Sequence, residues 1–77
     1  MTEQDVFRLV SDALAVPRDQ IHRGSSAQDI SGWDSMGTLG ILTALSRCGV
    51  RVEPADVDKL QSIEGILAEV RKAGKLD

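Results

Sequence analysis

The sequence predicts an all-α protein, a four-helix bundle with three long helices and one short third helix. Three segments repeat apolar residues three and four positions apart, the spacing of an amphipathic helix. Residues that favour helix starts and ends border these segments. Only residues 50–52 alternate as a strand does, and one strand alone has no partner to pair with. We therefore expect helices throughout.

The first helix is expected over residues 3–15. Thr2 and Asp5 have the spacing of a capping box, in which each side chain accepts a hydrogen bond from the other residue's backbone N–H group. Pro17 disfavours helical geometry at the residue before it and so ends the helix. The apolar residues of one face are Val6, Leu9, Val10, Ala13 and Leu14.

A long polar connection follows, from Pro17 to Trp33, with Ile21 and Ile30 as its apolar anchors. A connection of this length is uncommon in a compact domain unless it spans the length of a bundle. We expect it to run back along the first helix. The second helix would then start at the same end as the first and lie roughly parallel to it.

The second helix is expected over residues 35–47, with apolar positions at 36, 39, 42 and 45. The Asp34 side chain is expected to accept a hydrogen bond from a free backbone N–H group of the first turn. Ser35 is then the first helical residue, and its hydroxyl faces solvent. The leucines expected to face the core are Leu39, Leu42 and Leu45.

Two glycines interrupt this helix, Gly37 and Gly40, and each costs about 0.5–1 kcal/mol relative to alanine. Either another part of this chain approaches them closely, or a partner protein or bound group does. The sequence leaves both interpretations open. Gly49 suits the left-handed position after the helix. Cys48 is expected to be a buried or half-buried apolar residue, because no histidine lies near it in the sequence.

Two further helices complete the expected bundle. Pro54 at a first helical position opens a short helix over residues 54–60. Ser62 caps the last helix, Gly74 ends it, and residues 75–77 are expected to fray. The apolar stripe of the last helix consists of Ile63, Ile66, Leu67 and Val70.

Length and composition exclude several classes of function. The chain has 77 residues, enough for a single domain over 1–77, and a net charge of −3 with dispersed basic residues, which opposes nucleic-acid binding. No apolar run reaches membrane-spanning length, no signal-peptide pattern follows Met1, and one cysteine forms no internal disulfide, so we expect a cytoplasmic protein. With His22 as the only histidine and no paired carboxylates or glycine-rich phosphate loop, we do not expect an enzyme or a metal site.

Residues 32–39 read Gly-Trp-Asp-Ser-Met-Gly-Thr-Leu. Taken alone, Asp34 and Ser35 could be no more than a helix cap. The segment resembles the attachment motif of acyl and peptidyl carrier proteins, in which Asp-Ser-Leu or Asp-Ser-Met opens the second helix and the serine is esterified with 4′-phosphopantetheine. The loop before it and the apolar spacing after it are also similar, so the resemblance implies an acyl-carrier-like bundle.

The resemblance implies roles for particular residues. Ser35 would carry covalent 4′-phosphopantetheine from coenzyme A, and Asp34 would help to place the serine and the metal-bound coenzyme A in the transferase. Trp33 would either staple the loop onto the bundle or lie beside the prosthetic arm. The residues that would contact partners are Trp33, Met36, Gly37, Leu39, Gly40, Thr43, Asp56 and Val57. Those that would either line an acyl cavity or simply pack the core are Leu39, Leu42, Leu45, Leu60, Ile63 and Ile66.

The sequence departs from fatty-acid carriers in having no charged residue between Asp34 and Arg47. Acidic partner contacts would have to come from Glu53, Asp56 and Asp58. We therefore expect a discrete carrier of a specialised biosynthetic pathway, making a polyketide or nonribosomal peptide or transferring an aminoacyl group.

Its expected partners are a phosphopantetheinyl transferase, an acyl- or aminoacyl-loading ligase (adenylation enzyme) and a downstream synthase or transferase. A free-standing protein is expected because Met1 begins the chain and the chain ends just after the last helix, although a piece excised from a larger synthase stays open. A monomer is expected because a carrier must visit several enzymes. The alternatives are a carrier for primary fatty-acid synthesis and an unmodified helical docking module.

Overall fold

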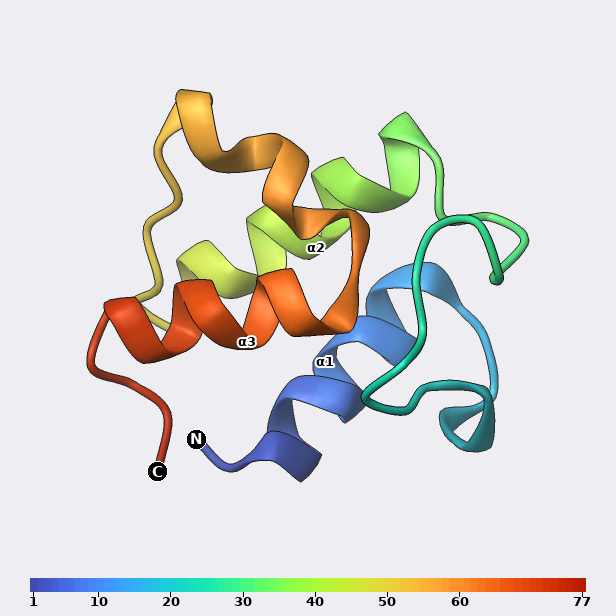
Figure 1. The fold of residues 1–77 in the computed structure, drawn as a ribbon, viewed down its shortest axis with the longest axis horizontal. Coiled ribbons are helices and arrows are strands. Elements are labelled where there is room, and N and C mark those ends of the chain that lie inside the picture. The colour runs from blue at the N-terminus through green and yellow to red at the C-terminus, as the bar shows by residue number, and fades with distance from the viewer.

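The protein is all-helical in the computed structural model, which describes all 77 residues (Figure 1). This confirms the predicted fold class, a small helical bundle. No helix has the length and apolar character needed to cross a membrane. The helices are α1 (Glu3–Leu14), the 3₁₀ turn η1 (Arg18–Gln20), α2 (Ser35–Arg47), the 3₁₀ helix η2 (Pro54–Gln61) and α3 (Ile63–Lys72).

The starts of the α-helices follow from local capping. At α1 the Thr2 hydroxyl accepts from Asp5 N at 3.1 Å, while Thr2 N donates to the Asp5 carboxylate at 2.9 Å, which confirms the capping box. At α3 the Ser62 hydroxyl accepts from Gly65 N at 3.0 Å. The end of α1 was predicted one residue too late, because Ala15 already adopts a left-handed conformation with φ of 56°.

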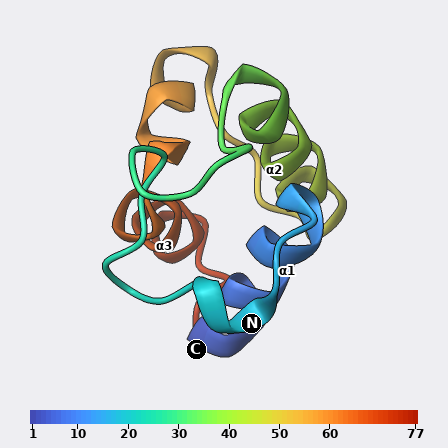
Figure 2. The same cartoon turned by 90° about the vertical axis from the view of Figure 1, so that its right-hand side faces the viewer.

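The start of α2 lies beside the end of α1, so the prediction of a parallel pair is wrong. A Cβ atom added to Gly37 would lie 2.6 Å from Leu14 Cδ2, and Gly40 faces Ala13. Figures 1 and 2 show the two helices running in opposite directions. The connection between them is held at α3 instead, where Ile63 N donates to Ser25 O at 3.0 Å. A hydrogen bond between residues so far apart in the chain has no local sequence signal.

The core is built from the facing sides of all the helices. Its fully buried members include Val6, Val10, Ile41, Leu45, Leu60, Ile63, Ile66 and Val70. The expectation for Leu39 is wrong, because its side chain is 55 % exposed, and Leu42 is only half-buried. Ile41 sets the buried face of α2, and Leu39, two residues away, stands about 200° around the helix from it.

Residues 54–61 form a helix where a short one was predicted, but of the tighter 3₁₀ type. Pro54 opens it without a side-chain cap. A Cβ atom at Gly65 would collide with the Lys59 carbonyl oxygen, so the backbones of η2 and α3 touch at this glycine. η2 is thereby fixed against the start of α3 and beside α2 (Figure 2).

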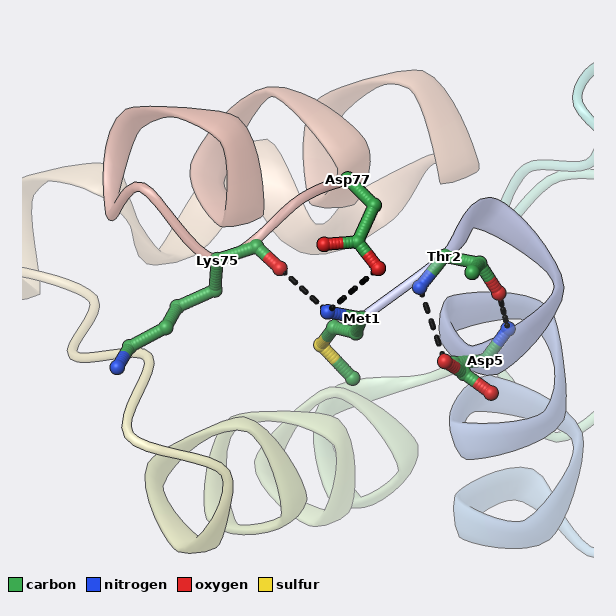
Figure 3. A network of polar contacts seen from close by, with 5 residues as sticks. All are labelled: Met1, Thr2, Asp5, Lys75 and Asp77. Atoms are coloured by element: carbon green, nitrogen blue, oxygen red, sulfur yellow. Dashed lines mark hydrogen bonds and ion pairs between the residues drawn. The ribbon is translucent and has the colours of Figure 1, made fainter.

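The two termini lie together, which corrects the expectation that residues 75–77 fray. The Met1 ammonium donates to Lys75 O at 2.6 Å and lies 3.7 Å from an Asp77 carboxylate oxygen (Figure 3). Asp77 N donates to Met1 O at 2.7 Å. Leu76 is half-buried against the core. The end of the chain is therefore fixed beside the start of α1.

Candidate functional site

Ser35 is the first residue of α2 and its side chain is exposed. Asp34 is the N-cap, as predicted, because one of its carboxylate oxygens accepts from Gly37 N at 3.0 Å. The Asp34 backbone carbonyl also accepts the first helical hydrogen bond, from Thr38 N at 2.8 Å. Since Asp34 fills the capping role, the Ser35 hydroxyl is left without a hydrogen bond inside the chain.

The backbone N–H groups of Ser35 and Met36 have no acceptor within the chain. Such free N–H groups at a helix start, together with the helix dipole, favour a negatively charged group. A phosphate ester on the Ser35 hydroxyl would lie within reach of both groups. The local structure is thus suited to an anion attached to this serine.

The loop before Ser35 is anchored by Trp33, whose side chain is only 3 % exposed. Its indole Nε1–H donates to Leu60 O at 3.1 Å. This burial corrects the assignment of Trp33 as a partner contact and agrees with the staple interpretation. Beside it, Gln61 Nε2 donates to Thr38 Oγ1 at 3.0 Å, so η2 is bonded to the first turn of α2. The Ser35 end of α2 is therefore held on its η2 side.

An open groove of about 780 Å³ lies on the other side of α2, between α1 and α2. We call it the α1–α2 groove; its walls include Leu9, Asp12 and Ala13 from α1 and Met36, Gly40 and Thr43 from α2. Met36, next to Ser35, is 76 % exposed, and Leu39 also borders the groove. Sequence reasoning missed this feature, although the small residues at 13, 40 and 44 are its signal.

The two glycines of α2 differ in what surrounds them. A Cβ atom at Gly37 would lie 2.5 Å from Gly32 O, so the chain's own loop approaches this glycine closely. A Cβ atom at Gly40 would meet only Ala13, at an ordinary 3.5 Å, and Gly40 lines the groove. Close packing within the chain explains Gly37, while Gly40 keeps the groove wide.

Other predicted contact residues lie in different settings. Thr43 is exposed, and its hydroxyl donates to Leu39 O at 3.0 Å. Val57 is half-buried against the core. Lys59 at 3.1 Å and Lys72 at 3.2 Å bond the Asp56 carboxylate, and these hydrogen bonds lower its pKa below the usual 3.8. Asp56 is thus already neutralised by two lysines, which weakens its predicted role as an acidic partner contact.

Cys48 is exposed at the far rim of the α1–α2 groove, so the prediction of a buried or half-buried thiol is wrong. The reason is geometric. Cys48 follows the last residue of α2, where the chain turns away through Gly49 in the left-handed region, with φ of 85°. The apolar residue that enters the core at this turn is Val50.

Comparison of the chain with protein-family models, with curated proteins and with solved structures finds no match. What the site can do therefore follows from its own residues. It presents one free hydroxyl, an adjacent carboxylate and two free N–H groups at an exposed helix start, with an open groove beside them.

Proposed function

We propose that this chain is a carrier protein that holds an acyl or aminoacyl group as a thioester on 4′-phosphopantetheine attached to Ser35. One observation carries the proposal. The Ser35 hydroxyl is exposed and unbonded on the first turn of α2, and Asp34 already provides the cap. The serine therefore has no structural task, and a modifying enzyme can reach it.

The residues around Ser35 fit the proposed group. The free N–H groups of Ser35 and Met36 suit its phosphodiester. One Asp34 oxygen bonds Gly37 N, and the other has no partner in the chain. That second oxygen is a suitable ligand for Mg²⁺, which would also hold the phosphates of coenzyme A. In loading, the Ser35 oxygen forms a bond to the phosphorus of the phosphopantetheine group, and the pyrophosphate bond of coenzyme A breaks to release 3′,5′-adenosine diphosphate. The hydroxyl proton passes to a base of the transferase.

The cofactor supplies the thiol on which cargo is held as a thioester. This chain's own residues do the rest: Ser35 provides the attachment point, Trp33 and the Asp34 cap fix the turn that presents it, and the folded bundle is what partner enzymes recognise. Catalysis of loading and transfer belongs to those enzymes. The protein is a substrate of its transferase and not an enzyme.

The surface of α2 favours a specialised pathway over primary fatty-acid synthesis. The helix carries no charge between its cap and Arg47, and its exposed apolar residues are Met36 and Leu39. A loading ligase and a downstream synthase or transferase would then bind it mainly through apolar contact. Such partners suit polyketide, nonribosomal-peptide or aminoacyl-transfer biosynthesis.

A second candidate function is an unmodified docking module. The exposed Met36 and Leu39 favour it, because large apolar side chains that do not serve the core commonly mark interaction surfaces. In that case α2 would bind a partner directly, and Ser35 would carry no group.

Intact-mass measurement separates the two functions. The protein is incubated with coenzyme A, Mg²⁺ and a phosphopantetheinyl transferase of broad specificity, beside Ser35→Ala and the matched control Ser31→Ala, which removes an exposed loop serine. We expect one phosphopantetheinyl group on the wild type and on Ser31→Ala, and none on Ser35→Ala. A folded wild type that gains no mass would favour the docking module, and loading of Ser35→Ala would refute the assignment of Ser35.

A further inference from the structure

We propose that the α1–α2 groove is the resting site of the phosphopantetheine arm on Ser35, an inference that rests on the proposed function. The groove begins beside the attachment point, because Met36 lines it and is the next residue after Ser35. It then follows α2 through Gly40 and Thr43 as far as Cys48. An arm leaving Ser35 therefore meets this groove at once.

The length of the groove matches the arm. With a helical rise of 1.5 Å per residue, Thr43 lies about 12 Å and Cys48 about 20 Å along α2 from Ser35. The arm has about fourteen bonds between the serine oxygen and the thiol sulfur; extended backbone covers three bonds in 3.3–3.6 Å, which gives about 16 Å. The thiol would reach a level between Thr43 and Cys48, near the far end of the groove but still inside it.

The walls of the groove offer both apolar and polar groups to the arm. Near Ser35 the walls are the apolar Met36 and Leu39, which suit the geminal dimethyl group of pantoic acid. Thr43 from one wall and Asp12 from the other add oxygen acceptors that suit the two amide N–H groups of the arm. Gly40 and Ala13 keep the floor of the groove low enough for an amide chain to lie there.

The opposite side of α2 offers no such path. Thr38 is buried and bonded to Gln61, and Trp33 is buried and bonded to Leu60. An arm placed between α2 and η2 would have to break these hydrogen bonds and leave buried polar groups unpaired, at a cost of about 1–3 kcal/mol for each group. The α1 side requires no such rearrangement.

Disulfide trapping tests the resting site. Two variants are made in a Cys48→Ser background, one with Thr43→Cys, which lines the groove, and one with Ser46→Cys, which is exposed outside it. Around α2, Ser46 lies only about 20° from the direction of Ser35, while Thr43 lies about 80° away. Along α2, however, Ser46 lies about 4.5 Å further from Ser35 than Thr43 does. The ratio of the two cross-linking rates is therefore compared with the same ratio in urea-unfolded protein, where the arm moves freely.

Each variant is loaded with coenzyme A and then oxidised with glutathione disulfide, which is reduced as the arm thiol and the new cysteine join. Intact mass follows the cross-link, and each rate is divided by the rate at which the unloaded variant reacts with glutathione disulfide. We expect the Thr43→Cys cross-link to form about tenfold faster than the Ser46→Cys cross-link, because confinement in the groove raises the effective concentration of the arm thiol near residue 43.

Equal rates, or a faster Ser46→Cys cross-link, would overturn the groove as the resting site. The loading step distinguishes this failure from failure of the proposed function. Protein that carries the arm but shows no preference for Thr43→Cys refutes only the groove, whereas protein that never gains the arm refutes the carrier function and with it this inference.

Discussion

The two flanks of α2 are built differently. On the η2 side, two hydrogen bonds from different residues join the elements, Trp33 to Leu60 and Gln61 to Thr38, and the interface is buried. On the α1 side, the helices approach closely at Gly37 and Leu14, and an open groove lined by Gly40 follows. One flank of the same helix is therefore bonded into the fold, and the other leaves an open groove.

The largest difference in stability is expected between substitutions on the buried face and on the exposed face of α2. Ile41 is fully buried, so Ile41→Ala removes packed atoms and leaves a cavity, and we expect a loss of about 2–5 kcal/mol in the free energy of unfolding. Leu39→Ala, on the exposed face, should change it by no more than about 0.5 kcal/mol. Urea denaturation followed by circular dichroism measures both. A large loss for Leu39→Ala would show that Leu39 belongs to the core.

The two glycines give a matched pair on the α1 flank. Gly37→Ala forces a methyl group to within 2.5 Å of Gly32 O, and such overpacking should destabilise the protein by about 1–3 kcal/mol. Gly40→Ala meets only ordinary contacts and should stabilise it by about 0.5–1 kcal/mol through better helix propensity. Thermal melts of the two variants check the signs. If both variants were stabilised, the close approach at Gly37 would be disproved.

Asp34 should combine a structural role with a proposed functional one, and two substitutions separate them. Asp34→Ala removes the cap and should cost about 0.5–2 kcal/mol, whereas Asp34→Asn keeps a side-chain oxygen for Gly37 N and should be nearly neutral. If the carboxylate also helps to place Mg²⁺ and coenzyme A, Asp34→Asn should load Ser35 more slowly despite normal stability. Denaturation curves measure the stabilities, and intact-mass time courses measure the loading rates. If Asp34→Asn loaded Ser35 at the wild-type rate, the carboxylate would have no role in placing Mg²⁺ and coenzyme A.

The smallest effect concerns Asp56, at the η2 side of the molecule. Hydrogen bonds from Lys59 and Lys72 lower the pKa of its carboxyl, so its contribution to stability is present above the unfolded pKa of about 3.8 and is lost as pH falls through the lower folded value. The melting temperature of wild type should exceed that of Asp56→Asn at pH 7, and the difference should disappear once the pH is below the folded pKa of Asp56. Asp58→Asn, at a residue without an ion pair, is the control. A gap unchanged at low pH would contradict this linkage.

Local signals were enough to place the helices. The capping residues Thr2, Asp34 and Ser62 act as expected, and α2 has the predicted bounds, because a cap needs only residues a few positions apart. The predicted 54–60 helix is present as η2, but the sequence did not distinguish 3₁₀ from α geometry there. Nor did it predict the close approach of the Lys59 carbonyl oxygen to Gly65 in α3, which no local pattern encodes.

The sequence by itself determined the fold class, the cap at Asp34 and the exposure of Ser35 at a helix start, since these depend on hydrogen bonds and periodicity within one turn. Only the tertiary structure decided that α2 runs antiparallel to α1, that Trp33 is buried, and that Leu39 and Cys48 are exposed. The physical reason is common to all of them. Each depends on how elements far apart in the chain pack against one another, and such packing has no signal within a single turn of sequence.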